Sequence, residues 1–93
     1  MTEHDPAYEL RVTAPAQRHL GRLPEGTAAA IVEFMLGALV EGPHRVGGRL
    51  QRELAGLHSA RRGAYRVVYE IDEDRHAVIV LRIDHRSRVY RIP

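Results

Sequence analysis

One segment in the second half of the chain alternates apolar and polar residues as a β-strand does, and arginines lie at its start. In the segment RRGAYRVVYEID, residues 61–72, the side chains of Tyr65, Val67, Tyr69 and Ile71 share one face under the two-residue period of a β-strand. Arg66 falls on the opposite face, together with Val68 and Glu70. Arg66 is therefore either a solvated strand charge or part of a functional site.

Two further strands flank this one. A strand is expected around residues 57–61, and Gly63 supplies the turn into the strand at 65–71. After the acidic turn DEDR, the segment HAVIVLRID at 76–84 has an unbroken apolar centre, which indicates a strand buried on both faces. These segments predict a three-stranded meander.

The first half predicts a short strand and two helices. Residues 7–13 alternate as a strand, and Thr13 is a suitable N-cap for a brief helix at 14–23. A longer helix is expected from Pro24 to Pro43, with Gly37 tolerated in its interior. Its apolar positions at helical spacing are Ala28, Val32, Met35, Leu36, Leu39 and Val40.

Residues 44–56 are a Gly- and Arg-rich connection that we expect to include one short helical turn. A chain of 93 residues predicts a single domain, 1–93. The order of a strand, two helices and a meander predicts an α+β fold, with the two-helix hairpin packed on one face of a largely antiparallel sheet. The other face of that sheet is expected to be open.

The basic charge is concentrated in the second half. The net charge is only +2, but residues 44–93 contain 11 Arg and 6 acidic residues, against 3 Arg and 6 acidic residues in 1–43. A strand-rich half of this charge suits a phosphate-bearing partner, because each guanidinium is a planar fork matched to phosphate oxygens. All 14 basic residues are Arg, and we give the absence of Lys no functional weight.

Composition also excludes cysteine chemistry and favours a cytoplasmic location. The chain has no cysteine, so disulfides and a thiolate nucleophile are excluded. No signal peptide and no apolar run near the roughly 18 residues of a membrane span are recognisable, so we expect a cytoplasmic protein with no membrane partner. Asp72, Glu73 and Asp74 lack the spacing of a calcium loop, so no metal site is expected.

Two segments resemble the signatures of the RelE/ParE superfamily of bacterial toxins. GLHSARRGAYRVVYEID, at 56–72, and HRSRVY, at 85–90, are similar to the Arg-x-Gly-x-Tyr-Arg-hydrophobic-hydrophobic-Tyr and His-Arg-x-x-x-Tyr patterns of that superfamily. The LPE start of the second helix and the GPHRVGGRL connection occur in the expected order. The RelE-like branch is the nearer resemblance, and it implies a small α+β fold of the microbial ribonuclease type.

That resemblance implies a set of site residues. Arg66 corresponds to the phosphate-contacting arginine of the central strand, Arg86 to the second catalytic arginine, and Tyr90 to the C-terminal tyrosine. Arg86 against Arg88 stays open, because this segment varies in length among relatives. Further substrate contacts are expected from the following residues: Arg61, Arg62, Arg88 and His58. RelE-like enzymes often carry lysines before the turn, where this chain has His58, Ser59 and Ala60.

The chemistry of such a site follows from the residue types. Metal-independent RNA cleavage uses the 2′-hydroxyl as an in-line nucleophile, so it requires a base, an acid for the leaving 5′-oxygen, and cations for the phosphorane charge. Tyr90 can act as the base only if the guanidinium groups of Arg66 and Arg86 favour its phenolate. His85 and His58 are alternative proton carriers. The competing interpretation makes Tyr90 an aromatic at the edge of the core.

The resemblance implies a type II toxin: an endoribonuclease without cofactors that cuts mRNA on the ribosome, blocks translation and arrests growth. It also implies a hetero-oligomer with a cognate RelB-like antitoxin, which we expect to be acidic and partly disordered because the basic half needs a neutralising partner. Two alternatives remain. One is a ParE-like toxin that inhibits DNA gyrase without nuclease activity, and the other is a binding module without turnover.

Overall fold

The computed structural model of the chain describes residues 6–87. The strands are β1 (Glu9–Val12), β2 (Gly48–Arg49), β3 (Leu57–Arg62), β4 (Tyr65–Asp72) and β5 (Ala77–His85). The helices are α1 (Ala14–Gly21), α2 (Glu25–Phe34), the π-helical segment η1 (Met35–Leu39), α3 (Pro43–Val46) and the 3₁₀ turn η2 (Arg52–Leu54). Within residues 6–87, no helix is both long and apolar enough to cross a membrane.

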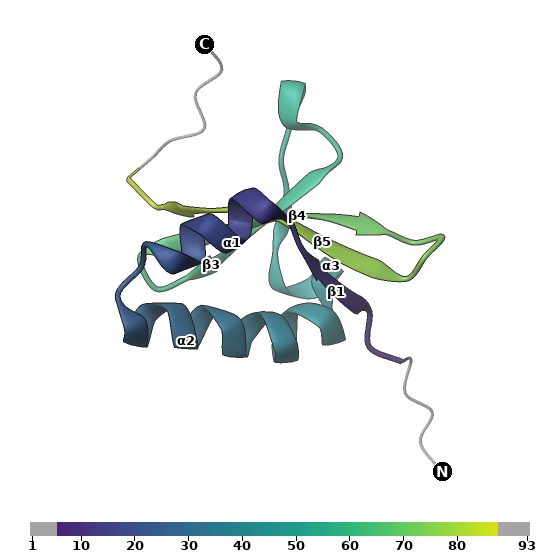
Figure 1. Ribbon diagram of the computed structural model, residues 1–93. Helices are drawn as coiled ribbons and strands as arrows, with labels where there is room; N and C mark the ends of the chain where they lie inside the picture. Colours follow the sequence, from purple (N-terminus) through teal and green to yellow (C-terminus); the bar gives the residue numbers. More distant parts are fainter. Residues whose placement is uncertain (1–5, 88–93) are drawn as a thin grey trace.

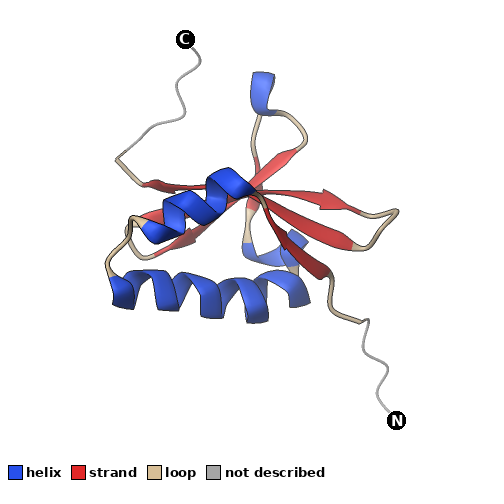
Figure 2. Ribbon diagram, viewed as in Figure 1, coloured by secondary structure: helices blue, strands red, loops and turns tan. Residues whose placement is uncertain are grey.

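The five strands form one sheet in the order β1-β5-β4-β3-β2 (Figure 2). Strands β2 to β5 pair in antiparallel fashion, and β1 is added to β5 in parallel. Helices α1 and α2 lie on the same side of this sheet (Figure 1). This arrangement confirms the predicted α+β fold and the predicted order of its elements.

The core lies between the helices and the sheet. Ala16 of α1, Ile31 and Phe34 of α2 and the buried residues of η1 pack against the apolar face of the strands. Val67 and Tyr69 belong to this core, and Tyr65 packs against it. The predicted facing of β4 is therefore correct, because Tyr65, Val67 and Tyr69 face the helices and Arg66, between them in the alternation, faces the other way.

The second helix buries only some of its apolar positions. Ile31 and Phe34 are buried, whereas Val32 is 36% exposed and Leu36 is 63% exposed. Val32 and Leu36 have the predicted helical spacing but lie outside the core, because apolar residues occur on both sides of this helix and spacing alone does not choose between them. Gly37 is tolerated as expected, since no atom lies within 4 Å of a Cβ built there.

Thr13 joins the start of α1 to β5. Its hydroxyl oxygen accepts a hydrogen bond from the Ala16 backbone N–H at 3.4 Å, which confirms the predicted N-cap. The same hydroxyl contacts the carbonyl oxygens of Val80 and Leu81 at 3.0 and 3.1 Å. Strand β5 has a bulge at this position, because the register passes from Tyr69 with Val80 to Val68 with Arg82 and leaves Leu81 without a partner.

The connection at 44–56 contains more structure than predicted. The expected helical turn is present as α3, which begins at Pro43, and η2 is a second short turn. The two-residue strand β2 was not predicted, since two residues carry no alternation to read. Gly63, in the hairpin between β3 and β4, has a φ of 61°, a backbone conformation that glycine adopts without strain.

Candidate nucleic-acid interface on the open sheet face

A row of charged side chains crosses the open face of the sheet, the face that α1 and α2 do not cover. Arg61 of β3 lies directly opposite Arg66 of β4, and Arg66 lies directly opposite Asp84 of β5. Directly opposed residues share a face of the sheet, so these three side chains stand side by side. Two of the predicted site residues, Arg61 and Arg66, are therefore neighbours on this face.

Arg82 and Asp84 extend this row of charges along β5. The Nε atom of Arg82 lies 2.9 Å from a carboxylate oxygen of Asp84. The Nε atoms of Arg66 and Arg82 are both shielded from solvent, while 42% of the Arg82 side chain is exposed. We call the surface formed by Arg61, Arg66, Arg82 and Asp84 the arginine face. Sequence analysis did not identify Arg82 or Asp84 as site residues.

Arg86 lies at the same end of the sheet. It occupies the turn after β5, and its backbone N–H donates a hydrogen bond of 2.6 Å to the carbonyl oxygen of Ala64 in the β3–β4 hairpin. Arg86 is exposed. Its backbone is thereby fixed beside the start of β4, against a residue two positions before Arg66. Arg88 and Tyr90 lie outside the described residues.

Arg62 points to the other side of the sheet. It is paired with Tyr65, whose side chain packs against the core, and its guanidinium carbon lies 5.1 Å from the centroid of the Phe34 ring. This geometry is a cation–π contact between β3 and α2. The structure therefore separates Arg62 from Arg61 and gives it a packing role against the helix.

His85 also lies on the helix side of the sheet. It is the cross-strand partner of Tyr65, and the two rings meet edge to face with centroids 5.2 Å apart. The backbone N–H of Ser87 donates to Nδ1 of His85 at 3.1 Å. Nδ1 is therefore an acceptor, and in the neutral ring the proton resides on Nε2.

His58 is buried on the helix side, at the far end of the strands from the β3–β4 hairpin. Its ring stacks on that of Tyr69 with centroids 5.5 Å apart. Burial lowers the pKa of His58, and His44 and Arg49 lower it further. Burial also raises the pKa of Tyr69 to about 12, and the Tyr69 hydroxyl donates to the carbonyl oxygen of Pro43. His58 is thus a packed, neutral side chain remote from Arg66.

Two further histidines, His44 and His76, have partners that sequence analysis did not find. His44 pairs with a carboxylate oxygen of Glu73 at 2.5 Å, and the Tyr8 hydroxyl donates to the same carboxylate at 2.9 Å. Hydrogen bonds from His44 and Tyr8 lower the pKa of Glu73. His76 stacks on Tyr8 with ring centroids 3.8 Å apart. The partners are far apart in sequence. These contacts therefore hold the N-terminal segment and α3 against the β4–β5 turn.

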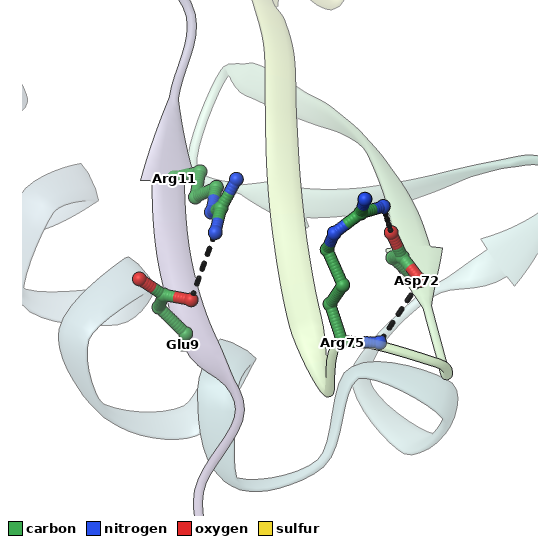
Figure 3. Close-up of polar contacts among 4 residues, drawn as sticks. All are labelled: Glu9, Arg11, Asp72 and Arg75. Atoms are coloured by element: carbon green, nitrogen blue, oxygen red, sulfur yellow. Dashed lines mark hydrogen bonds and ion pairs between the residues drawn. The ribbon is translucent and has the colours of Figure 1, made fainter.

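Two further ion pairs join nearby residues, one on β1 and one at the β4–β5 turn (Figure 3). Arg11 and Glu9 pair at 3.3 Å along β1, and Arg75 pairs with Asp72 at 3.2 Å within the β4–β5 turn. The Arg75 backbone N–H also donates to Asp72, and this bond lowers the pKa of that carboxyl. Among residues 6–87, no group of three or more His, Asp or Glu side chains is arranged to hold a metal ion.

Comparison with known proteins supplies the class of this protein. A family model described as the ParE toxin of the type II toxin-antitoxin system parDE matches residues 10–90. Toxin RelE of Mycobacterium tuberculosis is 53% identical over 88 residues, which cover 95% of this chain and 91% of that protein. Toxin RelG of the same organism is 51% identical over 84 residues, covering 90% and 97% of the two chains.

Solved structures agree with these matches. The RelBE2 toxin-antitoxin complex of M. tuberculosis contains a chain that is 50% identical, with a TM-score of 0.84, covering 86% of this chain and 99% of that one. The RelE–RelB complex of Pyrococcus horikoshii, at 22% identity, shares the fold with a TM-score of 0.71, covering 90% of this chain and 100% of that one. The class is thus that of type II toxin-antitoxin toxins. Within it, the chain belongs to the RelE/ParE toxin family.

Proposed function

We propose that the chain is a RelE-like toxin that cuts mRNA on the ribosome and thereby stops translation and growth. The observation that carries this proposal is the arginine face, where Arg61 and Arg66 stand together on the uncovered side of the sheet. Guanidinium groups held on a rigid sheet suit phosphate oxygens, since their forked donors make two parallel bonds. The 53% sequence identity with Toxin RelE of M. tuberculosis supports the same activity.

The roles follow from the chemistry of phosphodiester cleavage. Arg66 binds the scissile phosphate and stabilises the charge that builds on it as the 2′-hydroxyl attacks. Arg86, beside the start of β4, supplies the second cation, with Arg88 as the alternative. Tyr90 is the proton carrier of the proposal, activated by the arginines. His85 is the alternative carrier.

Arg61 extends the phosphate contact across β3. Arg62 and His58, which were expected as substrate contacts, act instead through packing in this proposal, because the Arg62 guanidinium lies over the Phe34 ring and the His58 ring is buried against Tyr69. The reaction needs no cofactor, since the 2′-hydroxyl of the substrate is the nucleophile and arginines carry the charge. Dependence on the ribosome follows as well, because arginines alone do not arrange the RNA for in-line attack.

The protein acts in the cytoplasm, held inactive by a RelB-like antitoxin. The relatives crystallised as RelBE complexes support a toxin–antitoxin hetero-oligomer. An acidic, partly disordered antitoxin that orders on the basic half of this chain would cover the same arginines that bind RNA. Inhibition and substrate binding then compete for one surface.

The alternative is a ParE-like toxin that inhibits DNA gyrase, and the observation that favours it is the name of the family model that matches residues 10–90. Primer extension on cellular mRNA after induction separates the two activities. Discrete cuts within translated codons, absent when the antitoxin is co-expressed, are expected. Intact mRNA together with broken DNA would establish the gyrase activity instead.

A further inference from the structure

The bulge in β5 reverses the alternation of that strand. Val78 and Val80 face the core, so an unbroken alternation would turn Arg82 toward the core and Ile83 away from it. Leu81 is left without a partner, and Arg82 lies opposite Val68 instead. The result is that Ile83 is buried in the core, and Arg82 and Asp84 both face the open side.

The bulge is fixed by contacts rather than being an irregular end of the strand. The hydroxyl of Thr13 contacts the carbonyl oxygens of Val80 and Leu81, and the Thr13 backbone N–H donates to Val80 at 3.0 Å. Bulges next to functional sites commonly re-aim a side chain, and this one places a charged pair in the arginine face. These contacts therefore determine which face of the sheet Arg82 occupies.

From this geometry we infer that Arg82 is a further contact for RNA phosphate and that Asp84 is its positioning residue. This inference rests on the proposed function, since it assigns new residues to the same surface. Arg82 is diagonal to Arg66 across the β4–β5 ladder, a separation of roughly 7 to 8 Å between such positions. Consecutive phosphates of a single strand lie at a comparable spacing, so the two arginines suit neighbouring phosphates.

The ion pair explains how a carboxylate is accommodated on an RNA-binding face. Asp84 contacts Arg82 through Nε, while four of the five N–H donors of a guanidinium are on its two terminal nitrogens. The Arg82 side chain is 42% exposed, so a phosphate can reach its guanidinium from solvent while Asp84 stays beside it. Only 18% of the Asp84 side chain is exposed, so its carboxylate lies beside Arg82 and is largely shielded from solvent.

The test uses the antitoxin-free toxin and a fluorescent single-stranded RNA that carries 2′-methoxy groups and cannot be cut. Affinity is measured over a range of salt concentrations. Arg82→Gln should weaken binding roughly tenfold at low salt. It should also lower the slope of log affinity against log salt by about 0.7, the loss of one phosphate contact. The matched control is Arg75→Gln, which removes an equal charge from the Asp72 pair in the β4–β5 turn and should change the slope little.

Asp84→Asn separates positioning from simple repulsion. A carboxylate that only repels RNA gives tighter binding when it is neutralised, whereas a carboxylate that positions Arg82 gives weaker binding. We expect Asp84→Asn to weaken binding severalfold and Asp84→Glu to restore part of it. Asp72→Asn is the control for the change in charge. Tighter binding by Asp84→Asn, or an unchanged salt slope for Arg82→Gln, would overturn the inference.

Cleavage on ribosomes programmed with mRNA is measured in parallel on the same proteins. Wild-type cleavage with unaffected RNA binding by Arg82→Gln leaves the proposed function intact and rejects the role of Arg82. Failure of the wild type to cut rejects the nuclease function, while the RNA-binding series still decides the role of Arg82. An effect of Arg82→Gln on antitoxin binding alone would assign this pair to the antitoxin and reject the inference.

Discussion

Arg61 and Arg66 lie directly opposite each other across the β3–β4 ladder, with Asp84 opposite Arg66 on the other side. Like charges at directly opposed positions destabilise an antiparallel pair, by up to about 1 kcal/mol. Strand pairing alone therefore does not account for two arginines here. A surface that binds phosphate does, because the repulsion is relieved when an anion lies between the two guanidinium groups.

This relationship predicts a trade between stability and activity at Arg61. Arg61→Thr removes the repulsion and introduces a residue that favours strands, so the free energy of unfolding should rise by roughly 0.2 to 1 kcal/mol. RNA affinity and mRNA cleavage should fall. Urea unfolding and RNA binding of the same preparation measure both effects.

Arg62→Thr is the control for that experiment. It alters the neighbouring residue, but on the helix side, where it removes the contact with Phe34. Its stability should fall slightly and its RNA affinity should stay near that of the wild type. An Arg61→Thr protein that is less stable than the wild type and binds RNA equally well would contradict the assignment of Arg61.

A second prediction concerns the two sides of α2 and η1. Ile31→Ala should lower the free energy of unfolding by about 2 to 5 kcal/mol, because Ile31 is 1% exposed and its removal leaves a cavity in the core. Leu36→Ala should change it by less than about 0.5 kcal/mol, since Leu36 is 63% exposed. Chemical denaturation of both variants checks this. Equal losses at the two positions would show that the helix packs through its other side.

A third prediction is a pH dependence of stability that arises from His58. The pKa of His58 is lowered in the folded protein, so the unfolded chain binds its proton first as the pH falls. The stabilising effect of the neutral ring is complete above about pH 6.5 and is lost as the pH falls from there toward the folded pKa. The free energy of unfolding, measured between pH 8 and 5, should therefore decline with falling pH.

His58→Leu identifies the source of that decline. Leucine fills a similar apolar space and does not titrate, so the fall in stability between pH 6.5 and 5 should be smaller in this variant than in the wild type. The comparison is between slopes, because the substitution also changes packing against Tyr69. Identical slopes for the two proteins would assign the pH dependence to other groups.

Much of the fold was predictable because its strands, helix starts and turns are marked by residues close together in sequence. The alternation of residues 65–71 gave the facing of Arg66, and Thr13 and Gly63 marked a helix start and a turn. The bulge at Leu81 was not predictable, because the apolar run of β5 has no alternation whose phase could be seen to change. Arg82 and Asp84 were missed for this reason, since their side of the sheet depends on the bulge.

The sides of Arg62 and His85 could have been read from the strand period. Residues one position apart in a strand point to opposite faces, so Arg61 and Arg62 cannot both lie on the arginine face without a bulge between them. His85 is paired with Tyr65 and shares its face for the same reason. The family patterns place such residues together because they are close in sequence, whereas the sheet places them on opposite faces.

The central claim is that Arg66 binds the scissile phosphate of mRNA on the ribosome. The most direct measurement is the cleavage rate of antitoxin-free Arg66→Ala on ribosomes programmed with a defined mRNA, with Arg75→Ala as the control and thermal unfolding as the test of folding. We expect a folded Arg66→Ala protein that cuts about 30- to 1,000-fold more slowly than the wild type, comparable to the loss of one oxyanion donor. Arg75→Ala should cut at the wild-type rate, and a folded Arg66→Ala protein that does the same would contradict the account.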